Sequence, residues 1–503
     1  MSPLEIAVVV AYALLLCVLS FYGAHRYQMA YLYYRHKYRL PTPRGRFERL
    51  PRVTIQLPIF NEMYVTERLI AAVCAIRYPR ELLEIQVLDD STDETQAIAR
   101  ACVDRWKAEG LDICYLHRAS RKGFKAGALE HGLALATGEL VAVFDADFVP
   151  GPDYLEKTVH FFTDPEVGVV QARWGHLNRE YSALTQCQSI LLDGHFVIEH
   201  TARNRSGRFF NFNGTAGTWR REAITAGGGW QHDTLTEDLD LSYRAQMKGW
   251  KFVFLPHVVT PAELPVEMNA FKAQQHRWAK GSVQTALKLL PGLLRSDLPD
   301  HVKREAVAHL TANFAYLLMI PLAILIPITV VVRVSHGWYE VLLLDIPFFA
   351  AATFSVAIFY VVSQAEQGMG WWRRVKYMPF VMALGIGLSV NQARAVVEAL
   401  MGYETGFTRT PKHGVGARPA GEPVAKKRYR AAATLQPLVE LALAAYMTYG
   451  IAFLIERGVY YSLPFLILFQ VGFGYVALAS IYEGLRSQVL RVVRALTPQP
   501  AAE

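Results

Sequence analysis

Acidic residues end two of the apolar segments in the first third of the chain. Asp89 and Asp90 close one segment, and Asp145 and Asp147 close another. Because side chains two apart in an extended chain point the same way, Asp145 and Asp147 form a pair of hard oxygen ligands. Such a pair suits Mg²⁺ or Mn²⁺ carrying a diphosphate. Helix capping is the structural alternative, and it fits Asp93 better than Asp89.

A basic stretch punctuated by glycine lies between the two acidic pairs. It covers residues 121–128 and leads into a pattern of helical spacing. Backbone amides at a helix N-terminus together with a lysine make a phosphate site, and Lys125 is the residue we expect to serve it. A surface turn is the structural alternative, since Arg121 and Lys122 are typical of solvated positions.

A glycine-rich stretch further along has the composition of a sugar-binding surface. In residues 209–221, Asn213, Gly214 and Thr215 lie beside phenylalanine and tryptophan residues. Aromatic faces stack on sugar rings, while amides and hydroxyls bind sugar hydroxyl groups. A core strand and turn would have a similar composition, and this alternative fits the phenylalanines best.

The segment before the second long apolar stretch combines polar and aromatic residues. Gln274, Arg277 and Trp278 recur at helical spacing, so they share one face of a predicted helix. An arginine beside a glutamine and an indole ring suits a phosphate group and a sugar ring. A tryptophan near a membrane could instead be an interfacial anchor.

Three carboxylates lie close together in a further motif: Glu237, Asp238 and Asp240. No basic residue separates them, and apolar residues at helical spacing follow. We predict that they begin a helix, because its electropositive N-terminal end stabilises negative charge. A well-capped helix start would produce the same pattern, so its meaning depends on the rest of the chain.

The elements that must position these residues follow from the hydrophobic pattern. Short apolar runs rich in β-branched residues predict buried strands, and helical spacing lies between them. This alternation predicts an α/β domain with a mostly parallel sheet and helices on both faces. Ligands bind beyond the carboxyl ends of such strands, so the acidic pairs should converge. The predicted strands are 53–60, 84–90, 113–118, 139–147 and 167–173, and the predicted helices are 67–76, 94–108 and 123–136.

The remainder of the chain has the composition of a membrane domain. Hydrophobic residues make up 52% of the sequence, and the mean hydropathy is +0.16. Five segments are long enough to cross a hydrocarbon core of roughly 30 Å. These segments are residues 4–22, 314–332, 341–362, 435–455 and 461–481.

The distribution of basic residues predicts the topology. Arginine and lysine follow the first apolar segment, so we expect a signal anchor with its N-terminus outside and a cytoplasmic domain up to about residue 310. Residues 377–400 begin apolar and become polar, and the following loop is strongly basic. We therefore predict an in-plane interfacial helix there, five membrane spans in total, and a cytoplasmic C-terminal tail.

Charge and cysteine usage exclude several classes of function. The net charge of +8 is mostly juxtamembrane, which favours contact with membrane lipids and requires no nucleic-acid partner. The five cysteines show no paired spacing, and four of them lie in the predicted cytoplasmic part. We therefore expect reduced thiols in the core rather than disulfides or a cysteine metal site.

Six motifs occur in an order that resembles a known enzyme family. They are LDDSTDET, the KAG of residues 125–127, the DAD of residues 145–147, NGTAGTWRR, TED and QQHRW. This set is similar to the processive family-2 glycosyltransferases, and most of all to the plant cellulose-synthase-like mannan and glucan synthases and their bacterial counterparts. The resemblance covers roughly residues 50–290 and implies a GT-A catalytic fold joined to an α-helical transmembrane domain.

The resemblance implies a donor site. Asp89 and Asp90 would hold the nucleoside and its diphosphate, helped by Lys125. Asp145 and Asp147 would bind the divalent metal, Mg²⁺ or Mn²⁺, and the nucleotide sugar. The donor would be UDP-glucose or GDP-mannose, between which the sequence does not choose.

The resemblance also implies a catalytic base and an acceptor site. Asp238 would be the general base, with Glu237 orienting the acceptor. Arg277 would bind the diphosphate, while Gln274 and Trp278 would bind the acceptor end of the growing chain. Asn213, Gly214 and Thr215 complete the predicted acceptor surface.

A later segment resembles the gating loop that closes over the nucleotide in cellulose synthases. Its matching residues are Phe407, Thr410 and Lys412, and it departs from the family pattern at Arg409, where a valine is usual. The sequence shows no counterpart of the cysteine-rich zinc module of plant cellulose synthases, and we expect no c-di-GMP-binding domain after the last apolar segment.

These residues predict an inverting β-glycosyltransferase. The acceptor hydroxyl would attack the α-linked sugar while Asp238 removes its proton, and one displacement would give a β-linkage without a second catalytic carboxylate. We expect a hexose polymer, glucan or mannan, that is exported through the membrane spans. The alternatives are transfer of a single sugar to a lipid acceptor, and a scaffold or transport protein without transferase activity.

The expected organisation places the enzyme in a bacterial inner or plasma membrane. The predicted units are an anchor (1–24), a basic linker (25–50), the cytoplasmic catalytic domain (51–290), a linker helix (291–312), a transmembrane hairpin (313–363), the interfacial helix (377–400), the gating-loop-like segment (401–432), a second hairpin (433–483) and a cytoplasmic tail (484–503).

Overall fold

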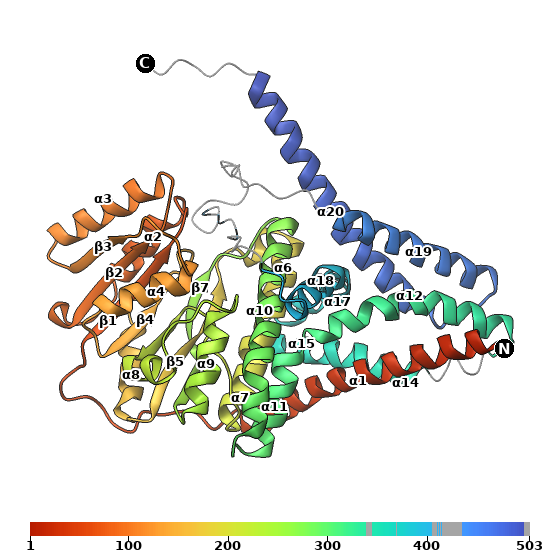
Figure 1. Cartoon of the computed structure of the whole chain (residues 1–503), viewed down its shortest axis with the longest axis horizontal. Coiled ribbons are helices and arrows are strands. Elements are labelled where there is room, and N and C mark those ends of the chain that lie inside the picture. The colour runs from red at the N-terminus through yellow and green to blue at the C-terminus, as the bar shows by residue number, and fades with distance from the viewer. Residues whose placement is uncertain are drawn as a thin grey trace.

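The computed structural model describes residues 1–338, 345–368, 370–404, 410, 412, 414 and 435–496. An α/β domain occupies one end of the molecule, and a bundle of long helices extends from it (Figure 1). The first part contains the predicted strand–helix region, and the second contains the predicted long apolar segments.

The α/β domain is built on one seven-stranded sheet with the strand order β3-β2-β1-β4-β6-β5-β7. Its neighbours are parallel except for β6, which runs antiparallel to both β4 and β5. The strands are β1 (Val53–Ile59), β2 (Leu83–Asp89), β3 (Asp112–His117), β4 (Leu140–Val143), β5 (Val167–His176), β6 (Gly217–Arg220) and β7 (Lys251–Ala262). The predicted mostly parallel sheet is confirmed, with β6 and β7 added to the five predicted strands.

Helices cover both faces of the sheet, as the strand–helix alternation predicts. On one face Ile55 and Leu57 pack with α2 (Thr66–Cys74) and α3 (Thr95–Ala108). On the other face Val141 and Val143 pack with a second set of helices. That set comprises α4 (Phe124–Leu135), α8 (Arg221–Ala226) and α9 (Glu237–Met247).

The register of the central strands brings the acidic motifs to one edge. Ile59 at the end of β1 lies opposite Asp89 at the end of β2. On the other side of β1, Gln56 lies opposite Val143, so the loop after β4 leaves from the same edge. The convergence expected from the parallel arrangement is therefore present.

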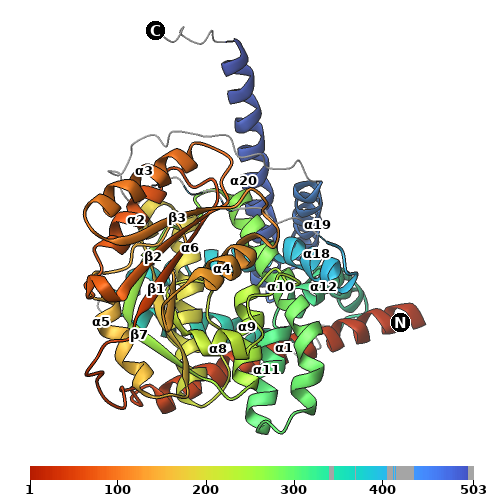
Figure 2. The ribbon, with the colours of Figure 1, turned by 60° about the vertical axis from the view of Figure 1, so that its left-hand side comes forward.

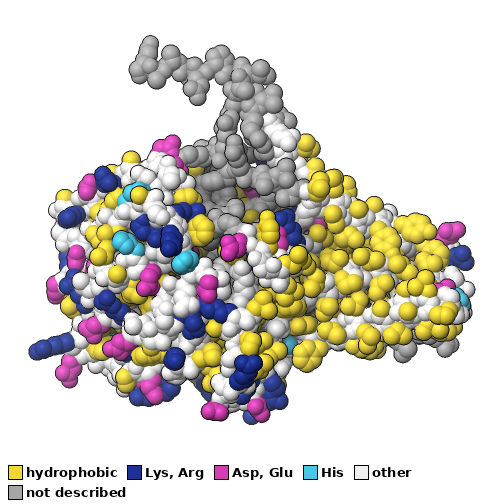
Figure 3. Space-filling model, in the orientation of Figure 1, with side chains coloured by type: hydrophobic (Ala, Val, Ile, Leu, Met, Phe, Trp, Pro, Cys, Tyr) yellow, Lys and Arg dark blue, Asp and Glu magenta, His cyan; other side chains and the backbone are white. Residues whose placement is uncertain are grey.

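Five helical segments of the described chain are long and apolar enough to cross a membrane. They are α1 (Pro3–His36), α12 (Phe314–Ser335), the segment Asp345–Ala365, α19 (Gln436–Glu456) and the first part of α20 (Leu463–Leu496). The third segment joins α14 (Asp345–Phe349), a π-helical turn (Ala350–Phe354) and α15 (Ser355–Ala365). Side chains over this end of the molecule are mainly hydrophobic, whereas charged residues gather on the α/β domain (Figure 3).

A bent helix pair corresponds to the predicted interfacial segment 377–400. α17 (Met378–Gly387) and α18 (Ser389–Leu400) meet at an angle of 40° and together would count as a sixth span. The in-plane orientation stays a prediction, because a sixth crossing satisfies the same length and composition.

One helix joins the two parts of the molecule. α10 (Met268–Arg295) lies between the sheet and helices α12 and α18, and it contacts both α9 and α18 (Figures 1 and 2). The chain then turns into α11 (Asp300–Thr311) before entering α12. The motif with Gln274, Arg277 and Trp278 is thus carried by the connecting helix.

The remaining elements are short and lie around the sheet or between the longer helices. They are α5 (Tyr154–Thr158), α6 (Ala183–Asp193), the π-helix η4 (Gly194–His200), α7 (Thr201–Arg205), α16 (Trp372–Val375) and the 3-10 helices η1 (Arg80–Leu82), η2 (Val159–Thr163) and η3 (Arg179–Tyr181).

Candidate active site

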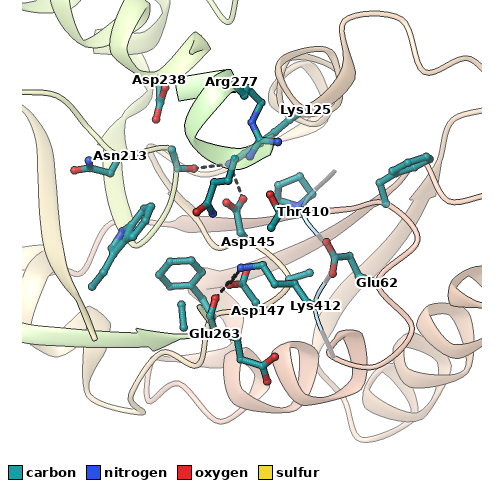
Figure 4. Close-up of a pocket in the computed structure, with 18 of the residues that line it drawn as sticks. Glu62, Lys125, Asp145, Asp147, Asn213, Asp238, Glu263, Arg277, Thr410 and Lys412 are labelled. Carbon is teal, nitrogen blue, oxygen red and sulfur yellow. Dashed lines mark hydrogen bonds and ion pairs between the residues drawn. The ribbon is translucent and has the colours of Figure 1, made fainter. Parts of the chain in front are cut away.

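A cavity at the carboxyl edge of the sheet collects most of the residues singled out from the sequence (Figure 4). Its walls come from the loops after β1, β2 and β4, the start of α9, and one face of α10. The predicted residues that line it are Asp90, Lys125, Asp145, Asp147, Asn213, Gly214, Glu237, Asp238, Gln274, Arg277, Trp278, Thr410 and Lys412.

Three predicted site residues do not line this cavity. Asp89 is fully buried beneath it, where its carboxylate accepts hydrogen bonds from the Tyr115 hydroxyl (2.6 Å) and the Ser91 backbone N–H (2.8 Å). Thr215 is also fully buried, and its hydroxyl accepts from the Asp145 backbone N–H (2.9 Å). Both therefore hold the loops that carry the lining residues. Phe407 lies outside the described residues.

Asp90 is held by an arginine that the sequence reasoning missed. Arg118 donates to both carboxylate oxygens of Asp90, from Nε (2.8 Å) and from NH2 (2.5 Å). The same NH2 group donates to the Phe124 carbonyl (3.0 Å). Arg118 follows β3 at the edge where β2 ends, so the strand-end rule would have found it had basic residues been considered together with acids.

The Asp145 and Asp147 carboxylates each face a lysine (Figure 4). Lys125 Nζ lies 2.5 Å from Asp145 Oδ1, and Lys412 Nζ lies 2.6 Å from Asp147 Oδ2. Burial raises the pKa of Asp145 against the opposing charge of Lys125. Burial lowers the pKa of Lys125, but the charges of Asp145 and Glu237 outweigh it and the net shift is upward.

The two carboxylates fit a divalent cation that arrives with a diphosphate. No group of three or more His, Cys, Asp and Glu side chains in the described part of the chain could hold a metal alone. Asp145 and Asp147 would therefore supply two oxygen ligands, and phosphate oxygens and water would supply the others, which is the usual arrangement for Mg²⁺. Two lysine ammonium groups already at these oxygens show that the site favours positive charge.

The acidic motif begins a helix, as predicted. Thr236 is the N-cap of α9, and Glu237 and Asp238 occupy its first turn. Asp238 Oδ1 accepts a hydrogen bond from the Leu239 backbone N–H (2.8 Å). Asp240 points away from the cavity and is fully buried in ion pairs with Arg244 and Lys288, so this third carboxylate is structural.

Burial and a neighbouring carboxylate change the acidity of Asp238. Burial, followed by the negative charge of Glu237, raises the pKa of Asp238 to about 7. Burial also raises the pKa of Glu237, against the charge of Lys125. Burial lowers the pKa of Arg277, while Glu237 and Asp145 oppose that shift. A carboxyl group with a pKa near neutrality is suited to accept a proton at physiological pH.

Gly214 allows the glycine-rich loop before β6 to approach Asp238. Its φ of +78° lies in the left-handed region, and a Cβ atom there would stand 3.0 Å from Asp238 Oδ2. Lys125 Nζ donates to the Gly214 carbonyl (2.9 Å). Glycine is therefore required both for the backbone conformation and for the close approach.

The polar face of α10 forms the wall opposite the sheet. Gln274, Arg277 and Trp278 all line the cavity, as their helical spacing predicts. The Trp278 ring lies near Trp174 at the end of β5, with ring centroids 6.4 Å apart. Trp174 was missed as a site residue, although a tryptophan directly after the predicted strand 167–173 was a usable signal.

Glu263 anchors the described part of the gating-loop-like segment. Lys412 Nζ donates to the Glu263 carbonyl (2.7 Å), and the Gly414 backbone N–H donates to Glu263 Oε2 (3.1 Å). Arg68 donates to the other carboxylate oxygen (2.7 Å). Thr410 and Lys412 thus lie over the acidic loop after β4. The sequence offered no signal for Glu263, because its partner lies far along the chain.

Two further cavities continue from the first one into the helix bundle. The second shares Asn213, Asp238, Gln274 and Trp278 with the first. The third shares a further set of lining residues with the second, among them Glu199, Asn313, Tyr316, Tyr360 and Gly385. The third is lined by α1, α12, α15, α17 and α20, so a continuous series of cavities connects the sheet edge to the candidate membrane helices.

Comparison with known proteins gives consistent family matches. The pattern of the family described as "Glycosyltransferase like family 2" matches residues 51–281. A glucomannan 4-beta-mannosyltransferase 7 of Arabidopsis thaliana is 33% identical over 453 residues, covering 85% of this chain and 77% of that protein. A glucomannan 4-beta-mannosyltransferase 1 of Oryza sativa subsp. japonica is 41% identical over 293 residues, 55% of this chain and 56% of that protein. The latter match thus spans little more than half of its relative.

A solved structure shares the fold. The mannosyltransferase PcManGT from Pyrobaculum calidifontis, in complex with GDP-Man and Mn²⁺, superposes with a TM-score of 0.50 at 22% identity. The superposition covers 78% of this chain and all of that protein. The α/β domain described above therefore has the GT-A fold.

Proposed function

The chain belongs to glycosyltransferase family 2, in its cellulose-synthase-like group, and on that basis we propose that it is a membrane-embedded, inverting β-mannosyltransferase that elongates a polysaccharide. One observation carries the proposal. Lys125, Asp145, Asp238 and Arg277, which lie far apart in the sequence, line one cavity at the edge of a GT-A sheet.

The donor half of the cavity suits a nucleoside diphosphate. We assign the nucleoside side to Asp90, supported by Arg118, with Asp89 beneath it holding the loop. The diphosphate would lie between Lys125, Arg277 and the carboxylates of Asp145 and Asp147. Basic groups on two sides stabilise the negative charge that develops as the diphosphate leaves.

A divalent cation fits the Asp145 and Asp147 carboxylates, as their chemistry indicates. When bound there, Mg²⁺ or Mn²⁺ would neutralise diphosphate charge and so help it to leave. Lys412 would then exchange its contact with Asp147 for one with phosphate.

The acceptor half supports a single displacement. The acceptor hydroxyl lies against Asp238, which removes its proton as the hydroxyl attacks the anomeric carbon from the face opposite the diphosphate. The bond from the anomeric carbon to diphosphate breaks as the new glycosidic bond forms, so an α-linked donor gives a β-linked product. Gln274 and Trp278 would hold the acceptor sugar, the latter by stacking.

Two lines of similarity favour GDP-mannose as the donor. The relatives in Arabidopsis and rice are named as glucomannan 4-beta-mannosyltransferases, and the GT-A neighbour was solved with GDP-Man and Mn²⁺. We accordingly place GDP-mannose first and UDP-glucose second.

The series of cavities supports export of the product. It leads from Trp278 to the space between α1, α12 and α17. Tyr316 and Tyr360 line both of the inner cavities, and tyrosine presents an apolar ring and a hydroxyl, which suits a passing sugar chain. We propose that the catalytic domain is cytoplasmic and that the polymer leaves through the helices of a bacterial inner or plasma membrane.

The test is a transfer assay on membranes that contain the full chain. Labelled GDP-mannose should give an ethanol-insoluble β-linked polymer in the presence of Mg²⁺ or Mn²⁺. Asp238→Asn should lower the rate about a thousandfold, the usual size of a general-base effect. Asp233→Asn, an exposed carboxylate outside the cavity lining, should leave the rate unchanged. Full activity of Asp238→Asn would refute the assignment of the base.

The same assay distinguishes the other acceptor class. A label that moves into the organic phase as a single-sugar lipid would show transfer to lipid, for which the apolar walls of the third cavity would then be the acceptor site. Incorporation from UDP-glucose but not from GDP-mannose would reassign the donor and leave the reaction class intact.

A further inference from the structure

A π-helix borders the acceptor half of the cavity and was absent from the sequence-based site. The helix is η4 (Gly194–His200), and its residues His195 and Glu199 line the second cavity together with Asn213, Asp238 and Trp278. π-helical turns are rare and are frequently found at functional sites. The histidine side chains of η4 contact Asn211 and Asn213 of the glycine-rich loop directly.

A chain of hydrogen bonds fixes the orientation of the Asn213 amide. His200 Nε2 lies 3.0 Å from the Asn211 carbonyl and 2.6 Å from Asn213 Oδ1. A carbonyl oxygen only accepts, so His200 Nε2 carries the proton and Asn213 Oδ1 must face it as a second acceptor. Burial lowers the pKa of His200 well below its ordinary value, which agrees with a neutral ring.

The other end of the same amide fixes the tautomer of His195. With its oxygen towards His200, Asn213 presents Nδ2 to His195 Nε2 at 3.0 Å, so Asn213 donates and this ring nitrogen accepts. The proton of the neutral His195 ring is then on Nδ1, which donates to Glu199 Oε2 (3.1 Å). Arg203 also donates to that carboxylate oxygen (3.3 Å), which keeps Glu199 ionised as an acceptor.

The π-helical winding is what brings both histidines to Asn213. Residues five apart on an α-helix would point about 140° away from each other. In η4 the rings of His195 and His200 lie with centroids only 4.3 Å apart. Gly194 at the start of η4 faces α15, where a Cβ atom would stand 2.6 Å from Phe359 and Tyr360. The winding and the glycine thus place this segment between the active site and the helix bundle.

We propose that His195, with its tautomer fixed by Glu199, is a positioning residue that holds the Asn213 amide towards the acceptor sugar. One Asn213 N–H is used by His195, and the second can meet an acceptor hydroxyl. The next residue, Gly214, stands against Asp238. The amide therefore binds a hydroxyl adjacent to the one that Asp238 deprotonates, which sets how the terminal sugar is presented. The inference rests on the proposed transferase function and adds an acceptor-positioning element to it.

The test separates acceptor binding from donor binding. The full chain in lipid nanodiscs is supplied with GDP-mannose and a short β-linked manno-oligosaccharide as acceptor. His195→Phe removes the hydrogen-bond acceptor for Asn213, so the apparent KM for the oligosaccharide should rise about tenfold, the usual effect of one lost hydrogen bond. The KM for GDP-mannose should stay within about twofold, because the donor half is untouched.

A conservative variant and a stability measurement exclude a merely structural effect. His195→Gln retains a side-chain oxygen that can accept from Asn213, so it should restore most of the acceptor affinity. His195→Met, whose thioether sulfur is only a weak hydrogen-bond acceptor, should behave like His195→Phe. His160→Phe removes a histidine outside the cavity lining and should change neither KM. All variants should unfold within a few degrees of the wild type.

Three outcomes would overturn the inference. They are an unchanged acceptor KM in His195→Phe, an equal rise in both KM values, and no difference between His195→Gln and His195→Met. A wild-type chain that does not elongate the oligosaccharide at all would instead refute the proposed function, so the two failures are distinguishable.

Discussion

At the scale of single residues, Asp238 governs the expected pH dependence. Burial and Glu237 raise its pKa to about 7, and the proposed base must be ionised to accept a proton. The rate at saturating donor should therefore rise about tenfold per pH unit below 7 and level off above it. A pH–rate profile of the wild type checks this, and a profile that is flat between about pH 5 and 8 would contradict the assignment.

The same carboxyl group should lower the stability of the folded chain as the pH rises, whereas it raises the transfer rate. Folding raises its pKa above the unfolded value of about 3.9, so the protonated form is the one that folding favours. Its stabilising contribution is present below about pH 4 and is lost as the pH rises through the folded pKa near 7. Asp238→Asn should remove this contribution to the pH dependence of the unfolding temperature, whereas Asp233→Asn should not.

Residues that terminate predicted strands were found from the sequence because the edge of a parallel sheet determines their place. Asp90, Asp145 and Asp147 are examples. Arg118 follows β3 and could have been found in the same way had basic residues been considered. Glu263 could not, since it acts through a partner that only the fold brings near. His195 was hidden for a different reason. Its role depends on π-helical winding, which α-helical spacing does not anticipate.

At the scale of elements, the contact between α9 and α10 sets the distance between Asp238, the proposed base, and the face of α10 that carries Arg277. Gly281 of α10 lies against the N-cap of α9, where a Cβ atom would stand 2.5 Å from the Thr236 side chain. Gly281→Ala should push the two helices apart, cost about 1–3 kcal/mol of stability, and lower the transfer rate as well. Thermal unfolding and the polymer assay would measure both effects.

The same helix offers a matched control for that substitution. Gly292, also in α10, has open space around it, with no atom within 4 Å of the place that a Cβ would take. Gly292→Ala should therefore stabilise the chain by about 0.5–1 kcal/mol through helix propensity alone, with no change in rate. Equal behaviour of the two variants would show that the helix contact does not limit the geometry of the site.

Elements with a regular hydrophobic pattern were predictable, and irregular ones were not. The first five strands and three early helices follow from alternating apolar runs. β6 is only four residues long and antiparallel, and its glycine-rich stretch indicated a strand only as the alternative to a sugar-binding surface. β7 carries two prolines and a register shift against β5, which obscured its pattern. α1 continues to His36, beyond the apolar segment that predicted it, so its more polar second half is helical as well.

At the scale of the whole molecule, the number of membrane spans determines on which side of the membrane the C-terminus lies. An N-terminus outside and five spans place the C-terminus in the cytoplasm, whereas a crossing by the α17–α18 pair would place it outside. A fluorescent protein fused to residue 503 should therefore fluoresce, and an alkaline phosphatase fused there should be inactive in a bacterial host. With the N-terminus outside, the reverse pattern would mean six spans and would refute the in-plane helix.

The connecting helix should also make the two parts of the molecule unfold together. Lys272 of α10 is paired with Glu440 of α19 at 2.7 Å, and both side chains are almost fully buried. Glu483 of α20, in the helix bundle, accepts hydrogen bonds from the Met268 and Asn269 backbone N–H groups. These bonds cap the N-terminus of α10. These polar contacts fix α10, and with it the Arg277 face of the active site, to helices of the bundle.

Breaking the buried pair should be costly because it leaves a carboxylate without its counter-charge. Lys272→Met should lower the stability of the full chain in detergent by about 3–5 kcal/mol, and Lys272→Met combined with Glu440→Leu should recover most of the loss. Lys251→Met, which breaks an exposed pair with Glu166, should cost no more than about 1 kcal/mol. Trp106, Trp219 and Trp250 lie in the α/β domain and Trp338 and Trp372 lie in the helix bundle, so tryptophan fluorescence reports both parts. A single transition that shifts with Lys272→Met would show coupled unfolding. Two transitions, with only the later one displaced, would show that the catalytic domain is stable independently of the bundle.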